Sequence, residues 1–215
     1  KCIIFGGESL DQNVIDRIRS CSFQGEMYNH YGPTETTIGK LLKHIQVSDT
    51  QVSLGTAIGN NAAFVLNEYQ QLLPIGATGE ICIAGSGLSK GYLNRSELTD
   101  EKFVDAPFLN GSKIYRTGDL GRMNSKLEIE FLGRNDDQIK LRGYRIELQE
   151  IEKVLHHFTA VDSAAVLVRK NELGQDDLVA YLVASTDLRA NVIIEFLSDR
   201  LPQYMIPTSF AQLDK

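Results

Sequence analysis

The sequence predicts a mixed fold, α/β followed by α+β, in two parts that meet near Gly133. The first part opens with a strand and a helix, and residues 38–132 then read mostly as short strands and turns. The second part, 138–215, alternates strands with amphipathic helices and has the size of a small domain. The short polar segment 133–137 between the two parts is suited to a hinge.

The elements of the first part follow from local residue patterns. The apolar run 2–5 predicts a buried strand, and Val14, Ile15 and Ile18 recur at helical spacing after it. Segment 29–35 contains Gly-Pro and is therefore predicted to be a loop. Further strands are expected in β-rich or alternating segments at 62–66, 80–84 and 127–131.

The second part has clearer periodicity. Residues 138–148 read as a strand pair that turns at Gly143. The helix that follows has an apolar stripe at i, i+3, i+4 and i+7, formed by Ile151, Val154, Leu155 and Phe158. Strands are expected at 163–168, 178–184 and 209–213, with a turn at 171–174. A second helix, which stops before Pro202, has one apolar side formed by Val192, Ile193, Phe196 and Leu197.

Composition and charge narrow the class of protein. The 215 residues are 42% hydrophobic and 23% charged, as is typical of soluble globular proteins. The net charge of −6 argues against nonspecific nucleic-acid binding, which needs a basic field. The longest apolar run, 178–184, is too short to span a bilayer. Three scattered cysteines predict buried free thiols in a reducing compartment. We therefore expect a cytoplasmic protein without nucleic-acid or membrane partners.

Segment 31–35, Tyr-Gly-Pro-Thr-Glu, has residue types suited to a nucleotide. An aromatic face can stack on a base, and Gly-Pro fixes a turn that lets backbone approach a ligand. Thr34 offers a hydroxyl to a phosphate oxygen. Glu35 offers a carboxylate to Mg²⁺, which usually shares its oxygen ligands with substrate phosphates. Taken alone, the segment is explained better as a surface turn.

Two later segments could also carry chemistry. In 115–120, Asp119 beside a turn can accept hydrogen bonds from both hydroxyls of a ribose, although these residues equally suit a hairpin corner. Segment 133–147 has cations that could bind phosphates or lie on a solvated strand pair, namely Arg134, Lys140, Arg142 and Arg145. The glycine-rich stretch 85–91 reads as a tight turn. Walker A, HExxH, paired CxxC and GxSxG patterns do not occur.

Together, five segments resemble the adenylation domains of nonribosomal peptide synthetases, within the larger group of AMP-forming acyl and aryl ligases and luciferases. In chain order they are 29–35 (NHYGPTE), 79–93 (GEICIAGSGLSKGYL), 115–120 (YRTGDL), 133–152 (GRNDDQIKLRGYRIELQEIE) and 201–207 (LPQYMIP). Five motifs in the family's order make the resemblance highly specific. The YGPTE and LPxYMIP segments favour the peptide-synthetase branch over acyl-CoA ligases.

The resemblance implies a fold and a reaction. Residues 1–132 would end a large N-terminal α/β region with a distorted β-barrel subdomain, and 138–215 would form a small, mobile C-terminal α+β lid. Asp136 falls at the family's hinge. The implied enzyme is an AMP-forming ligase that uses ATP and Mg²⁺ to convert a carboxylic acid, here an amino acid, to an acyl-adenylate. The acyl group would then pass to the phosphopantetheine thiol of a carrier domain after the lid rotates.

The resemblance also implies residue roles around the nucleotide. Tyr31 would stack on adenine, with Asn29 and His30 near the amino edge of the base. Thr34 would contact the α-phosphate, and Glu35 would hold Mg²⁺.

Further roles follow for the ribose, the lid and the substrate. Asp119 would bind the ribose diol with the support of Arg134. Lys140 and the Gly143 turn would face the active site in the thioester-forming pose, so the expected catalytic residues are Thr34, Glu35 and Lys140. The substrate-pocket positions are Ile4, Gly6, His30, Ile38 and Gly39. His30 departs from the family, which usually has a small residue there.

The chain begins and ends in strand-like runs, so we expect it to be a fragment of a longer protein. The family's phosphate loop and the aspartate that pairs with a substrate amine would lie upstream. Its adenylation lysine would lie just beyond Lys215, which truncates the lid. We therefore expect the fragment to be inactive alone. The alternatives are an acyl- or aryl-CoA ligase of the same superfamily, or a catalytically silent fragment that docks a carrier protein.

Overall fold

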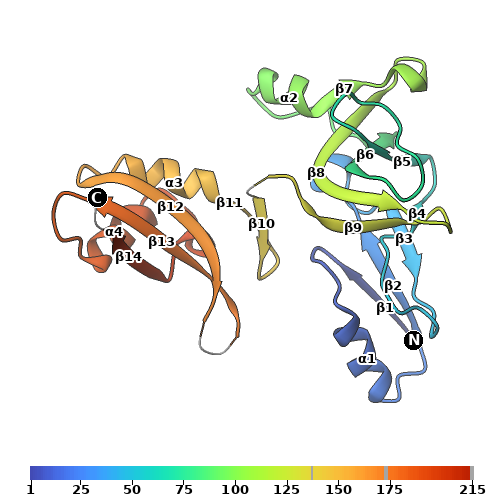
Figure 1. Cartoon of the computed structure of the whole chain (residues 1–215), viewed down its shortest axis with the longest axis horizontal. Helices are drawn as coiled ribbons and strands as arrows, with labels where there is room; N and C mark the ends of the chain where they lie inside the picture. The colour runs from blue at the N-terminus through green and yellow to red at the C-terminus, as the bar shows by residue number, and fades with distance from the viewer. Residues whose placement is uncertain (137, 172–173, 214–215) are drawn as a thin grey trace. The chain divides into compact units, whose positions relative to one another are not determined.

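The computed structural model describes residues 1–136, 138–171 and 174–213. The chain divides into two compact units, Lys1–Asp136 and Asp137–Lys215, here called the first and the second unit (Figure 1). Each unit has its own hydrophobic clusters, and each is described by itself.

The first unit begins with a four-stranded sheet in the order β1-β2-β3-β4. Strand β1 (Cys2–Gly6) runs parallel to β2 (Glu26–Tyr31), whereas β3 (Leu41–His44) and β4 (Thr56–Ala57) continue the sheet in antiparallel pairs. Helix α1 (Gln12–Ser20) connects β1 to β2 and is capped by the carboxylate of Asp11, which accepts a hydrogen bond from Asn13 N at 2.9 Å. Its Ile15 packs on Met27 and Ile45, so one face of this sheet is covered.

A second, five-stranded sheet completes the first unit and curls as a half-barrel. Strands β5 (Asn61–Leu66), β6 (Thr78–Gly85), β8 (Lys113–Met123) and β7 (Phe103–Asp105) pair in that order, and β9 (Ile129–Arg134) pairs with β8. The long β8 bends along its course in Figure 1. Short helical segments are η1 (Thr34–Thr36), α2 (Ser96–Lys102) and η2 (Pro107–Leu109). Tyr31 and Leu41 pack against Ile81 and Ile129, which joins the two sheets.

The second unit starts with a hairpin of β10 (Gln138–Leu141) and β11 (Tyr144–Glu147). Helix α3 (Leu148–His156), β12 (Val161–Lys170), β13 (Asp176–Ala184), α4 (Ala190–Ser198), η3 (Gln203–Met205) and β14 (Ser209–Leu213) follow. The sheet order is β12-β13-β14, with β14 parallel to β13. Both helices contribute to one cluster with the sheet, through Ile151 and Leu155 of α3 and Ile193 and Leu197 of α4. They therefore cover the same sheet face (Figure 1).

Most expected elements are confirmed, but two sequence predictions are wrong. Asn29, His30 and Tyr31 belong to β2 rather than to a loop, because the Gly-Pro turn begins only after the strand. Helix α2 lies in a region predicted to be mostly short strands and turns, and sequence patterns did not single it out. Of the cysteines, Cys82 is buried, but Cys2 and Cys21 are exposed; all three are free thiols. The predicted turn at 171–174 includes residues 172–173, which lie outside the described residues, as do Asp137 and Lys215.

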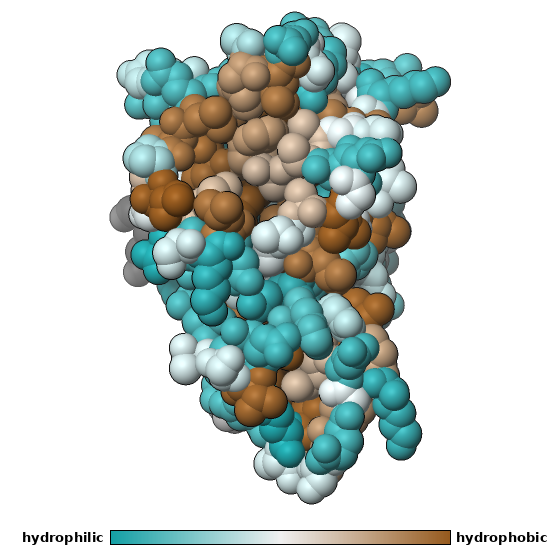
Figure 2. Space-filling model, turned by 90° about the vertical axis from the view of Figure 1, so that its right-hand side faces the viewer, coloured by the Kyte–Doolittle hydropathy of each residue, from teal (hydrophilic) through white to brown (hydrophobic). Residues whose placement is uncertain are grey.

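The surface is mixed in polarity. Figure 2 shows apolar side chains gathered in patches between hydrophilic ones on the face that turns toward the viewer. Within the described ranges, no helix combines the length and apolar character needed to cross a bilayer.

Candidate active site

Asp119 lies at the centre of the candidate site in the first unit. It projects from β8 and is only 4% exposed. The hydroxyl of Tyr31, at the end of β2, donates a hydrogen bond to Oδ2 of Asp119, and Nη1 of Arg134 pairs with Oδ1. Asp119 and Arg134 are register partners of β8 and β9, so the sheet itself brings the carboxylate and the guanidinium together. Three predicted site residues thus converge, although they are far apart in the sequence.

Arg134 extends this group to the last described residue of the first unit. Its Nε lies 2.6 Å from Oδ1 of Asp136, and its Nη2 lies 2.7 Å from Oδ2, so the pair is bidentate. Gly118 allows this arrangement. It has φ +74°, and a Cβ at this position would lie 2.6 Å from Oδ2 of Asp136. Glu80 fixes this stretch of β8 by accepting a 2.9 Å hydrogen bond from Gly118 N.

Glu35 lies in η1 and is buried. Its Oε1 accepts a 2.8 Å hydrogen bond from the hydroxyl of Tyr92, and its carbonyl accepts one from Ser89 N at 2.7 Å. The predicted phosphate turn is therefore tied to the segment after β6. Burial raises the pKa of Tyr92, and hydrogen bonding to Tyr115 and Glu35 raises it further, so Tyr92 keeps its proton. Burial followed by the charge of Asp119 likewise holds the pKa of Tyr31 well above its usual value.

The remaining residues predicted to contact the nucleotide have distinct surroundings. Thr34 is exposed, which leaves its hydroxyl accessible. Asn29 is buried, and its Nδ2 donates to Ser53 O at 2.9 Å. Tyr31 is 8% exposed, since it packs in the cluster between the two sheets.

Three of the predicted pocket residues, Ile4, Gly6 and His30, share the sheet face opposite α1. Gly6 and His30 are register partners of β1 and β2, and Ile4 lies two residues before Gly6 on the same face. A Cβ on Gly6 would lie 2.9 Å from His30 O, and a Cβ on Gly39 would overlap the His30 imidazole. Ile4 and Ile38 are exposed by 64% and 68%. Sequence reasoning missed that Tyr28 and His44 stack at 4.7 Å on this face, because the pairing depends on the register of β2 and β3.

Lys140 lies in the second unit, exposed on β10, where it is the register partner of Arg145. The turn after it is left-handed, with φ +53° at Arg142 and +80° at Gly143. Lys140 and the Asp119 group belong to different units, so the role of Lys140 at that site stays a prediction.

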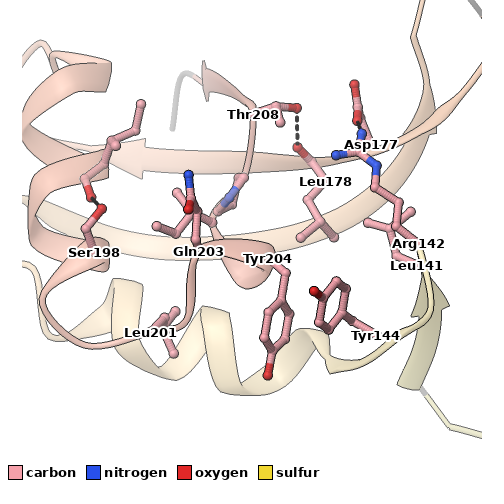
Figure 3. A pocket seen from close by; sticks show the side chains of 13 residues that line it. Leu141, Arg142, Tyr144, Asp177, Leu178, Ser198, Leu201, Gln203, Tyr204 and Thr208 are labelled. Atoms are coloured by element: carbon pink, nitrogen blue, oxygen red, sulfur yellow. Dashed lines mark hydrogen bonds and ion pairs between the residues drawn. The ribbon is translucent and has the colours of Figure 1, made fainter.

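A groove of about 730 Å³ borders the β10–β11 hairpin (Figure 3). The rings of Tyr144 and Tyr204 stack at 4.1 Å along it, and Arg142 pairs with Asp177 at its edge. Apolar side chains also line it, including those of Leu141, Leu178 and Leu201. Sequence patterns did not identify this groove, since its walls come from four separate segments.

We next asked which side chains could bind a metal ion. Among the residues that the structure describes, no group of three or more His, Cys, Asp or Glu side chains could hold an ion. A single buried carboxylate such as Glu35 fits a different arrangement, because Mg²⁺ in nucleotide sites takes one or two carboxylates and completes its shell with phosphates and water.

Comparisons with known proteins agree with the motif resemblance. Residues 1–93 match the family model described as AMP-binding enzyme. The chain is 41% identical over 213 residues to tyrocidine synthase 3 of Brevibacillus parabrevis, covering 99% of this chain and 3% of that protein. It is similar to PA1221, an NRPS protein containing adenylation and PCP domains, with a TM-score of 0.84 and 27% identity. That match covers 100% of this chain and 43% of the PA1221 chain.

A further solved structure carries a ligand. The chain is similar to the Vibrio cholerae adenylation domain AlmE in complex with glycyl-adenosine-5'-phosphate, with a TM-score of 0.88 and 26% identity. The match covers 100% of this chain and 42% of AlmE. The chain thus spans less than half the length of these two solved relatives, and only 3% of tyrocidine synthase 3.

Proposed function

Because this chain belongs to the AMP-binding enzymes, in the branch of the adenylation domains of nonribosomal peptide synthetases, we propose that its protein activates a carboxylic acid with ATP. The products would be an acyl-adenylate and pyrophosphate, and the acid would be an amino acid. The observation that carries this proposal is the convergence of Tyr31, Asp119 and Arg134 in the first unit, beside a turn that holds Glu35.

Asp119 is the proposed ribose site. A carboxylate has about four acceptor positions, which suits a diol with two donating hydroxyls. Both oxygens of Asp119 already have donors, so the ribose would replace or share the contacts of Tyr31 and Arg134. Stacking of adenine on Tyr31 would need the same adjustment, since its ring is nearly buried. Asn29 and the backbone of His30 would border the base from β2.

Thr34 and Glu35 are the proposed phosphate and magnesium contacts. Thr34 is exposed at the start of η1, where its hydroxyl could reach the α-phosphate. Glu35 would hold Mg²⁺ together with phosphate oxygens. When bound, the ion stabilises negative charge on the phosphoryl oxygens as pyrophosphate leaves. The chain's own contribution is a carboxylate fixed by Tyr92, and a turn fixed by the bond from Ser89 N to Glu35 O.

The second unit would act as the lid. We propose rotation at Asp136, after which Lys140 and the Gly143 turn face the active site for thioester formation. The partner would be a carrier domain with a phosphopantetheine thiol, in line with the adenylation and PCP domains named for PA1221. Ile4, Gly6, His30, Ile38 and Gly39 would form one wall of the acid pocket. Because the relatives are much longer, we propose that these 215 residues alone are inactive.

The test is ATP–pyrophosphate exchange by the protein expressed from its full reading frame, with amino, keto and aryl acids and with the 215-residue chain in parallel. We expect exchange with one class of acid in the full protein only. Asp119→Asn should reduce exchange about 10- to 100-fold, because hydrogen bonds to a charged group contribute about 1.5–3 kcal/mol. Circular dichroism of this variant controls for folding.

The outcomes separate the alternatives. Transfer of the activated acid to coenzyme A rather than to a carrier domain would support the CoA-ligase alternative. Carrier binding without ATP binding or exchange would support the docking fragment, and would refute adenylation. Exchange by the 215 residues alone would overturn the proposed inactivity of this chain.

A further inference from the structure

The carboxylate of Glu35 contacts the first of two neighbouring tyrosine hydroxyls. The hydroxyl of Tyr92 lies 2.8 Å from Oε1 of Glu35 and 3.3 Å from the hydroxyl of Tyr115. Glu35 comes from η1, Tyr92 from the segment before α2, and Tyr115 from β8. Three distant segments therefore meet at the hydroxyl of Tyr92.

Tyr92 is held in place by contacts that do not involve its hydroxyl. Its backbone N–H donates to Oγ1 of Thr99 at 2.9 Å. Its ring meets the Phe103 ring edge-on at 5.9 Å, and Phe103 in turn packs on Tyr115 at 5.0 Å. Phe103 and Tyr115 are both buried. Packing thus fixes the Tyr92 ring, and this holds its hydroxyl at the Glu35 carboxylate.

A phenol that donates to a carboxylate has two effects. It fixes the orientation of the carboxylate, and it uses one acceptor position while the others remain for a cation. Hydrogen-bond partners of this kind behind metal ligands typically change metal affinity or activity by about 10–100-fold when removed. A phenol is protonated at neutral pH, so the donor is present.

We propose that Tyr92 is a positioning residue that orients the Glu35 carboxylate toward a divalent cation bound with the nucleotide. This inference rests on the proposed function, because it needs a magnesium–nucleotide complex at η1. Tyr92 touches neither nucleotide nor metal in this scheme, and it acts through Glu35. Tyr115 is the next member of the chain of hydroxyls.

The experiment compares ATP binding with excess MgCl₂ and with EDTA, measured by isothermal titration calorimetry on the full-length protein without acid substrate. The ratio of the two dissociation constants reports what the metal contributes. In Tyr92→Phe, which keeps the packed ring, we expect this ratio to fall about tenfold toward one, with metal-free binding unchanged. A general loss of structure would instead weaken both values equally.

Three variants control the result. Tyr69→Phe removes an exposed hydroxyl on the loop after β5, and should leave both constants unchanged. Tyr115→Phe should lower the ratio less than Tyr92→Phe, and it serves as the test should Tyr92→Phe fold poorly. In Glu35→Gln the ratio should already be near one, so adding Tyr92→Phe should have no further effect.

The failures are distinguishable. If wild-type protein binds no ATP, the proposed function is refuted and this inference falls with it. If wild type shows a magnesium-dependent gain that Tyr92→Phe retains in full, the inference alone is overturned. Equal weakening of metal-free and magnesium-dependent binding would assign Tyr92 a purely structural role, and would also overturn it.

Discussion

Replacing Arg134 with glutamine tests how strongly the Asp119 group stabilises the first unit. The side chain of Asp119 is 6% exposed and that of Arg134 is 14% exposed, so water screens their attraction poorly. The same guanidinium also pairs with Asp136 and donates to Thr117 O at 3.1 Å. Arg134→Gln would therefore leave the buried Asp119 carboxylate without its cation.

The expected cost follows from burial. Removing one partner of a buried ion pair typically destabilises a protein by about 3–5 kcal/mol. The hydroxyl of Tyr31 still donates to Asp119 in the variant, so we expect about 2–3 kcal/mol. Arg122→Gln, on the neighbouring strand β8, is the matched control. It breaks a 2.7 Å pair with Glu130 in which the arginine is 44% exposed, and should cost less than about 1 kcal/mol.

The assay is urea unfolding followed by far-ultraviolet circular dichroism. Because two units can unfold separately, hydrogen exchange of the amides of β8 and β9 reports the first unit independently. Adding Asp119→Asn to Arg134→Gln removes the uncompensated charge, and should recover about 1–2 kcal/mol. The reasoning is refuted if Arg134→Gln costs no more than Arg122→Gln, or if the double variant is less stable than Arg134→Gln.

Three further predictions concern stability and reactivity. Gly55→Ala should lower the free energy of unfolding by about 3 kcal/mol, because φ is +82° and the new Cβ would overlap the Leu42 carbonyl. Gly76→Ala, with φ +87° and open space around it, should lower it by only about 1 kcal/mol. The urea midpoints of the two variants measure the difference. Burial would raise the pKa of Glu128, but hydrogen bonds from basic and polar neighbours outweigh burial and lower it from 4.5. The contribution of Glu128 to the free energy of unfolding is therefore complete above pH 4.5 and is lost as the pH falls through the lower folded pKa. If the stability of wild type falls no more steeply with acid than that of Glu128→Gln, this prediction is contradicted. Burial raises the pKa of the Cys82 thiol, so a thiol reagent should label the other two cysteines quickly and Cys82 only on unfolding, as peptide mass spectrometry would report.

Elements with a strong local period were predicted from the sequence. The stripe formed by Ile151 and Leu155 predicts α3, because apolar residues at helical spacing give the helix one face that packs on the sheet. Helix α2 has no buried residue, so it carries no apolar stripe, and sequence periodicity had nothing to detect. The error at Asn29–Tyr31 has a different cause. These polar residues form a strand because β1 lies parallel beside them, which is a contact that local sequence does not report.

For the candidate site, too, the sequence identified residues but not the contacts between them. Asp119 and Arg134 were identified by motif, but their direct pairing depends on the register of β8 and β9, which includes a bulge between Leu120 and Gly121. Tyr92 was inside a quoted motif, yet its contact with Glu35 spans 57 residues of sequence. Residue identity therefore nominated the candidate groups, whereas the partner of each group is set by strand register and packing.

The clash that a Cβ on Gly39 would make with the His30 ring couples two positions of the proposed pocket wall. A side chain at position 39 requires the imidazole at position 30 to move or to be replaced, so the two positions are not independent. A smaller residue at position 30 removes the clash. The effect of a substitution at position 39 therefore depends on which residue stands at position 30, and a designer altering this wall has to vary the two positions together.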